Sequence, residues 1–246
     1  MCTLTFLPEA HGYVVGMNRD ELNSRGLASA PVVHGLGSFN VIYPREQSGG
    51  TWIAANSKGN LLALLNLNEI PADNLPSKIK SRGDIIPAIL QQDTPDKAER
   101  AVVEFGLLGF RPFRLVGIFP GLREIRQWKW DGRQFSSRWM EWARHHWFSS
   151  SRSDVQAEEK RGRACESTCR EGIVDRLGWL RQLHASHLPE AGAFSICVHR
   201  RDAATVSYTE VECGREELRM RYVSGHPCRP TSAPAEITIE RRGEHG

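Results

Sequence analysis

The sequence predicts an α+β protein built mainly on antiparallel sheet, because strand-like and helix-like segments alternate in blocks. The order is strands, helices, strands, one long helix and strands, with no internal repeat or linker. Residues 61–65 are apolar at every position, which is typical of a strand covered on both faces. Two sheets sandwiched between helices would satisfy such strands. With 246 residues, 40% of them hydrophobic and 25% charged, the chain has the composition of a globular protein.

Two hairpins are predicted in the first third of the chain. Residues 2–7 and 13–18 are rich in apolar and β-branched side chains, and residues 8–12 between them have turn chemistry. Residues 51–56 and 61–66 flank the turn sequence Ser-Lys-Gly-Asn in the same way.

Helical periodicity begins at Ser81, which is placed to cap a helix over residues 82–92. Asp93 or Thr94 is placed to cap a second helix, with Pro95 in its first turn. Residues 113–119 and 124–130 then resemble another pair of strands around Pro-Gly.

The second half of the chain predicts an irregular aromatic stretch, a long helix and closing strands. Residues 133–155 have no clear period, and a long helix is expected from about Val155 onward, with apolar spacing that continues through Ile173. Three strands are expected at 194–199, 205–211 and 218–223. We expect one domain over residues 1–228 and a loosely ordered tail over 229–246, because the tail is rich in proline and charge.

Composition excludes several classes of protein. No run of 18 apolar residues is present, so no membrane span is expected, and no secretory signal is visible at the start of the chain. A cytoplasmic protein with reduced thiols is therefore expected. The net charge of +3 does not by itself favour nucleic acid. Cys165 and Cys169 lack a second pair at zinc-finger spacing, and neither a metal nor a cofactor is expected.

Cys2 is the most informative residue for chemistry. Initiator methionine is normally removed before a small second residue, which would leave Cys2 at the amino terminus. Its thiol and its free α-amino group would then belong to one residue, and the pKa of an α-amino group, about 7.7–8.0, leaves a useful fraction neutral. Such an amine can act as the general base for its own thiol.

The predicted first hairpin brings Asn18, Arg19 and Asp20 beside Cys2, because the end of its second strand lies next to the start of its first. A carboxylate there would orient the amino group through a charge-assisted hydrogen bond. An arginine would favour the thiolate and could hold an anionic substrate group.

These residues resemble the NRDE family, which includes transport and Golgi organisation protein 2. The similarity rests on Cys2, on Asn-Arg-Asp-Glu at 18–21 and on Gly-Gly-Thr-Trp at 49–52, and it continues at 65–66, 81–83 and 195–210. The resemblance implies a four-layer αββα sandwich similar to that of the N-terminal nucleophile hydrolases.

The resemblance also implies site roles and an activity, the hydrolysis of a small linear or cyclic amide. By position, Cys2 matches the nucleophile and Asp20 the residue that holds its amino group, while Asn66 is the candidate for oxyanion contact. Arg19 is expected to hold substrate or tune the thiol, and Asn18 and Trp52 to contact substrate. Met17 stands where the related acylases carry an arginine, and two further stretches, at 113–115 and 145–148, depart from the family pattern.

Two alternative functions remain open. The family connection with haem movement and lipid balance suggests a carrier of haem or of an apolar or acyl ligand, with His145 and His146 beside tryptophans as candidate contacts. Residues 111–182 carry 15 Lys and Arg against 9 Asp and Glu, and residues 128–147 hold five of the seven tryptophans, a combination that can stack single-stranded nucleic acid. Cys197 and His199 share one face of a predicted strand, so a Cys–His pair is also geometrically possible.

Overall fold

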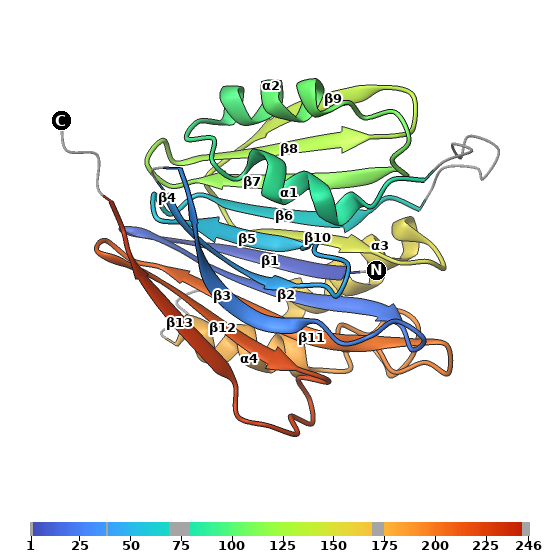
Figure 1. The fold of residues 1–246 in the computed structure, drawn as a ribbon. Helices are drawn as coiled ribbons and strands as arrows, with labels where there is room; N and C mark the ends of the chain where they lie inside the picture. The colour runs from blue at the N-terminus through green and yellow to red at the C-terminus, as the bar shows by residue number, and fades with distance from the viewer. Residues whose placement is uncertain (1, 38, 69–78, 169–174, 243–246) are drawn as a thin grey trace.

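Two antiparallel β-sheets lie face to face at the centre of the molecule, and helices cover their outer faces (Figure 1). The computed structural model describes residues 2–37, 39–68, 79–168 and 175–242. The first sheet has six strands in the order β10 (His145–Ser149), β1 (Cys2–Glu9), β2 (Gly12–Leu22), β11 (Ala203–Cys213), β12 (Glu217–Ser224) and β13 (Ala235–Glu240). The second has seven strands in the order β3 (Ser29–Leu36), β4 (Phe39–Arg45), β5 (Ile53–Asn56), β6 (Leu61–Asn66), β7 (Phe113–Phe119), β8 (Glu124–Trp130) and β9 (Phe135–Met140).

Each sheet is covered by its own set of helices. A 3-10 turn, η2 (Arg82–Asp84), leads into α1 (Ile85–Ile89), which with α2 (Pro95–Phe105) packs on the seven-stranded sheet. The six-stranded sheet is covered by α3 (Asp154–Thr168) and α4 (Arg176–Ala185). None of the helices among the described residues is long and apolar enough to cross a membrane.

The two-sided apolar character of β6 follows from its place between layers. Leu61, Ala63 and Leu65 point into the core between the sheets, while Leu62 and Leu64 pack toward α1 and α2. Alternate side chains of a strand face opposite sides of its sheet, so a strand buried on both sides is apolar throughout. The predicted sandwich of two sheets between helices is confirmed.

The predicted first hairpin is also confirmed, and its register positions the site. β1 and β2 pair with Cys2 opposite Arg19 and Thr3 opposite Asn18. β2 continues past the start of β1 and pairs along its other edge with β11, where Asp20 lies opposite Thr205. Asp20 on β2 is thereby held between the start of β1 and β11.

Three expectations for strands are wrong. The stretch predicted as irregular contains β9 and β10, and β10 completes the other edge of β1 with Ser149 opposite Cys2. Residues 194–199 form no strand and make only the isolated bridge between His199 and Ala204. The tail predicted as loosely ordered contains β13, which closes the sheet against β12. Of these strands, β10 pairs with a strand far away in sequence, while β9 and β13 pair with the preceding strands β8 and β12. Pairing with a neighbouring strand, which the period of a segment does not reveal, decides these assignments.

The helices are shorter than predicted. Thr94 caps α2 as expected, since its hydroxyl accepts from the Lys97 N–H at 3.3 Å. Ser81 makes no capping hydrogen bond, and α1 ends at Ile89. Asp175 begins a separate helix, α4, by accepting from the Gly178 N–H, so the expected long helix is divided; Ile173 and Cys169 lie outside the described residues.

Candidate functional site

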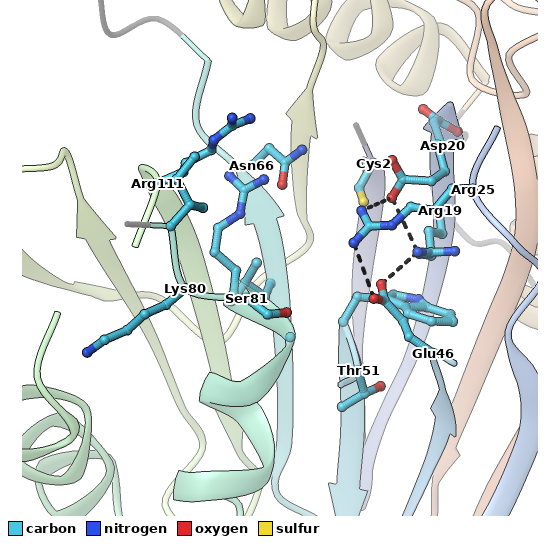
Figure 2. A pocket seen from close by; sticks show the side chains of 16 residues that line it. Cys2, Arg19, Asp20, Arg25, Glu46, Thr51, Asn66, Lys80, Ser81 and Arg111 are labelled. Carbon is cyan, nitrogen blue, oxygen red and sulfur yellow. Dashed lines mark hydrogen bonds and ion pairs between the residues drawn. The ribbon is translucent and has the colours of Figure 1, made fainter. Parts of the chain in front are cut away.

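A pocket of about 340 Å³ opens where β1 begins, and it gathers five of the residues that the sequence singled out (Figure 2). These are Cys2, Arg19, Asp20, Trp52 and Asn66. They come from both sheets, so the pocket is a product of the sandwich and not of one hairpin. The rest of its lining is mostly polar and consists of Glu21, Arg25, Glu46, Thr51, Leu64, Ile79, Lys80, Ser81, Arg82, Gly83 and Arg111.

Cys2 lies almost fully buried at the inner end of the pocket, with 6% of its surface exposed. Burial raises the pKa of its thiol, and the neighbouring Asp20 carboxylate adds to that rise. The positive charges of the chain's amino terminus and of Arg19 lower the pKa, but burial outweighs them. The expectation that Arg19 favours the thiolate therefore gives the direction of its effect correctly, whereas the net shift is upward. A thiol in this setting needs a base to become a nucleophile.

Arg19 is held by two carboxylates and one aromatic ring. Its Nη2 lies 2.6 Å from Glu46 Oε1 and 3.2 Å from Glu21 Oε2. Its guanidinium carbon lies 4.4 Å from the centroid of the Trp52 ring, a cation–π contact. These partners hold the Arg19 guanidinium in a fixed position beside the pocket and compensate its positive charge.

Asp20 is buried beside Cys2 and contacts Thr205 and Arg161. Its Oδ1 accepts a hydrogen bond from Thr205 Oγ1 at 2.6 Å, and its Oδ2 lies 3.6 Å from Arg161 Nη2. Burial raises the pKa of the Asp20 carboxyl, while Arg161 and the positive amino terminus lower it.

Arg161 is the site residue that sequence reasoning missed. It reaches from α3 into the sheet, where its Nη1 donates to Thr3 Oγ1 at 2.9 Å and to the Cys2 carbonyl at 3.4 Å. The signal was available in the spacing of α3, whose buried residues follow a helical face that includes this arginine: Asp154, Ala157, Arg161, Ala164 and Cys165. A charged residue on a buried face requires a partner, and here that partner is Asp20.

Asn18 does not reach the pocket, which corrects its expected role as a substrate contact. Its side chain is fully buried on the opposite face of β2 from Arg19, and its Nδ2 donates to the carbonyls of His184 and Ile196 at 2.8 and 2.9 Å. The pleat of the strand separates these neighbouring residues. Asn18 instead ties α4 and the segment before β11 to the sheet.

Two glycines explain why separate motifs meet at this pocket. Gly50 and Gly83 approach so closely that a Cβ on Gly50 would lie 2.8 Å from the Gly83 main chain. The Thr51 N–H donates to the Gly83 carbonyl at 3.0 Å across this contact. Any side chain at Gly50 would force the two segments apart. The Gly-Gly-Thr-Trp stretch is thus packed directly against the Ser-Arg-Gly stretch.

The side of the pocket away from Cys2 carries Asn66 and Arg111 (Figure 2), and Arg82 also lines the pocket. Burial lowers the pKa of Arg82 to about 10, and the charge of Arg111 adds to that effect. Arg82 donates to the Pro112 carbonyl at 2.8 Å, and among the described residues no carboxylate lies within ion-pair distance of Arg82 or Arg111. The pocket therefore carries positive charge that the described residues do not neutralise through an ion pair.

The residues named for the alternative functions do not converge on one ligand. His145 and His146 alternate along β10, where His145 contacts the Glu141 carbonyl and His146 contacts Thr5 Oγ1. Burial lowers the pKa of His146 to about 4. Of the five clustered tryptophans, Trp128, Trp130 and Trp147 are buried in the core, which leaves no continuous stacking surface for bases.

The chain matches a known protein family. A family model described as Transport and Golgi organisation 2 matches residues 1–168. The chain belongs to this family. No curated protein sequence matches it.

Solved structures show which fold this member of the Transport and Golgi organisation 2 family adopts. Penicillin V acylase from Agrobacterium tumefaciens is similar over 98% of this chain and 86% of its own, with 10% identity and a TM-score of 0.56. The C2A mutant of conjugated bile acid hydrolase from Clostridium perfringens is similar over 98% and 92%, with 9% identity and a TM-score of 0.54. The protein has the αββα sandwich of the N-terminal nucleophile hydrolases, as its resemblance to the NRDE family implied.

Proposed function

We propose that the protein is an amidohydrolase whose nucleophile is Cys2 after removal of Met1. The observation that carries the proposal is the meeting of Cys2, Arg19 and Asp20 at one polar pocket at the beginning of β1. The acylase and bile acid hydrolase names of the structural neighbours support hydrolysis of an amide as the reaction class.

The proposed reaction has two steps. In the first, the neutral α-amino group of Cys2 takes the thiol proton while the sulfur attacks the amide carbonyl carbon. The tetrahedral intermediate collapses when the ammonium returns that proton to the leaving nitrogen, which breaks the C–N bond and leaves a thioester on Cys2. In the second, the amine takes a proton from water, the hydroxide oxygen attacks the thioester, and the acid product departs as the thiol is restored.

The neighbouring residues have distinct roles in this proposal. Asp20, fixed by Thr205 and Arg161, orients the amino group through a charge-assisted hydrogen bond. Asn66 lines the same pocket and supplies an amide donor to the oxyanion; such a donor is worth about 3–4 kcal/mol of barrier when well aimed. Arg19, rigid between Glu46 and Trp52, positions substrate.

The charge of the pocket favours a polar substrate over an apolar cargo. A carrier of haem or an acyl chain requires a largely apolar cavity, whereas this one is lined by five basic and three acidic side chains among its 16 residues. Arg82 and Arg111, without carboxylate partners among the described residues, are placed to bind an anionic group of the amide.

The test combines intact mass with turnover. Mass spectrometry of the purified protein should show the loss of Met1, and a panel of small amides with and without anionic groups should reveal turnover that Cys2→Ala abolishes. Cys213→Ala is the matched control, because Cys213 is also buried in the core between the sheets but pairs with Tyr13 at the far end of the first hairpin. It should keep wild-type turnover.

Two results would overturn the proposal. Retention of Met1 in an active protein removes the amine from the thiol-bearing residue. Undiminished turnover in Cys2→Ala removes the nucleophile.

A further inference from the structure

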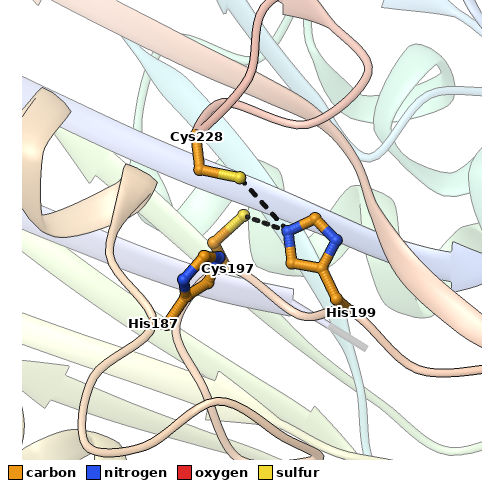
Figure 3. Close-up of side chains that lie close together, drawn as sticks. All are labelled: His187, Cys197, His199 and Cys228. Carbon is orange, nitrogen blue, oxygen red and sulfur yellow. Dashed lines mark hydrogen bonds between the residues drawn. The ribbon is translucent and has the colours of Figure 1, made fainter.

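Four potential metal ligands meet where the connection between α4 and β11 lies beside the loop between β12 and β13 (Figure 3). They are His187, Cys197, His199 and Cys228, and one ligand atom from each lies within 4.8 Å of all the others. His187 follows the end of α4, Cys197 and His199 precede β11, and Cys228 lies between β12 and β13. The four residues come from two connections, one between α4 and β11 and one between β12 and β13, and their spacing along the chain gave no metal motif.

The distances within the cluster suit a tetrahedral ion. His199 Nε2 lies 3.2 Å from Cys228 Sγ and 3.6 Å from Cys197 Sγ. Zinc–sulfur bonds of about 2.3 Å and zinc–nitrogen bonds of about 2.0–2.1 Å, at tetrahedral angles, separate sulfur and nitrogen ligands by about 3.5 Å. One ring nitrogen can hydrogen-bond fully to only one thiol, whereas a shared ion satisfies both sulfurs and the nitrogen at once.

We propose that His187, Cys197, His199 and Cys228 form a structural zinc site. Two thiolates and two imidazoles make a closed four-ligand set, which zinc prefers for structural sites, while hard cations such as magnesium prefer oxygen ligands. Binding releases the two thiol protons and leaves the imidazoles neutral, so affinity for the metal rises with pH.

Main-chain hydrogen bonds hold the two connections in place around the cluster. The Cys197 N–H donates to the Ser186 carbonyl at 2.8 Å and the Ile196 N–H to the Leu188 carbonyl at 2.9 Å, which brings the two ends of the connection between α4 and β11 together. His226, two residues before Cys228, contacts the Thr205 carbonyl through Nδ1 at 2.7 Å. Because these bonds do not involve the ligand atoms, the site is preorganised and not assembled around the ion alone.

The connection that carries three of these ligands also contacts the residues that hold Asp20 beside Cys2. Thr205, whose hydroxyl donates to Asp20, in turn receives the Val198 N–H at 2.8 Å, and Val198 lies between two of the ligands. The Ile196 carbonyl accepts from Asn18 on β2. An ion bound here would therefore brace the segment that positions Thr205 and Asp20 without touching substrate.

The test uses the full-length protein purified under reducing conditions without a metal-affinity column. Elemental analysis should find about one zinc per chain, and removal of zinc by a chelator should lower the thermal midpoint. Cobalt added to the chelated protein should produce the thiolate charge-transfer and visible bands of a tetrahedral site. Cys228→Ala and His187→Ala, which change side chains that are partly or fully exposed, should reduce zinc content to near zero and weaken the cobalt bands.

Matched controls separate ligand loss from general damage. Cys213→Ala removes a remote buried thiol, and His11→Ala removes a remote exposed imidazole; both should keep one zinc per chain. The proposal is overturned if the wild-type chain holds no zinc and gives no cobalt bands. It is equally overturned if both ligand variants bind zinc as tightly as wild type, or if intact mass shows Cys197 and Cys228 joined as a disulfide in the freshly reduced protein.

Discussion

Arg161 and Asp20 form a fully buried ion pair directly behind Cys2, with Nη2 and Oδ2 3.6 Å apart and neither side chain exposed. The arginine also donates to Thr3 Oγ1 and to the Cys2 carbonyl, so one helix residue holds the first strand and the acidic residue of the second. A charge buried in this way is costly unless its partner is present.

Arg161→Met should therefore destabilise the protein strongly. It leaves the buried Asp20 carboxylate without its cationic partner, and loss of one member of such a pair costs about 3–5 kcal/mol. Urea unfolding should show this loss, and the double variant Asp20→Asn with Arg161→Met should lose less than the sum of the single changes. Arg163→Ala, an exposed change on the same helix, is the control and should stay near wild type. Additive single and double effects would show that the pair is not coupled.

Stability should fall as the pH drops from about 6.5 to 4. Burial lowers the pKa of His146 to about 4 and that of His184 to about 3, from 6.5 in the unfolded chain. Because the pKa of each histidine is lower in the folded state, the unfolded state binds more protons between the two pKa values. The free energy of unfolding is therefore highest above about pH 6.5 and falls as the pH approaches the folded-state pKa. The shift of His146 corresponds to roughly 3 kcal/mol.

His146→Gln isolates this contribution. Glutamine can keep the contact with Thr5 but does not titrate, so unfolding measured across this pH range should show a shallower slope than wild type. The raised pKa of Asp20 acts in the opposite sense, with stability lost as pH rises, and is common to both proteins. His11→Gln, an exposed change at the first hairpin turn, should keep the wild-type slope. Equal slopes in all three proteins would contradict a buried neutral His146.

Arg82→Ala and Arg111→Ala should weaken binding of an anionic amide if the pocket acts as proposed. Hydrogen bonds to charged groups are worth about 1.5–3 kcal/mol, so KM should rise roughly tenfold to a hundredfold. A neutral amide of similar size should show little change. Lys97→Ala, which removes an exposed lysine on α2 outside the pocket, is the control. Equal effects on charged and neutral substrates would argue against recognition of an anion.

Gly50→Ala should destabilise the protein by about 1–3 kcal/mol, the usual cost of overpacking. The new Cβ would meet the Gly83 main chain at 2.8 Å, and main chain cannot move aside as a side-chain tip can. Gly35→Ala is the matched control, because its Cβ would meet no atom within 4 Å. Thermal unfolding of the two variants measures the difference, and similar midpoints would show that the two segments can separate without cost.

The site was predictable where it depends on local pairing. A tight hairpin sets its own register, so the approach of Arg19 and Asp20 to Cys2 follows from the length of the two strands and their turn. The same reasoning misplaced Asn18, because it considered only proximity along the strand, whereas strand alternation puts Asn18 on the face opposite Arg19. Asn66 and Trp52 line the same pocket; they were singled out through family resemblance and not through any local rule, and their roles stay predictions.

The amino-acid sequence by itself determined the alternation of strands and helices, the two-sided burial of β6 and the hairpin that begins at Cys2, because periodicity and turn chemistry act over a few residues. Only the tertiary structure decided that β10 completes the edge of β1, that Arg161 neutralises Asp20, and that His187, Cys197, His199 and Cys228 converge. The first two of these contacts join segments more than a hundred residues apart, and the third joins two separate loops. All three form when the sheets and helices pack against one another. The local pattern of the sequence does not indicate which distant segments pack together in the folded protein.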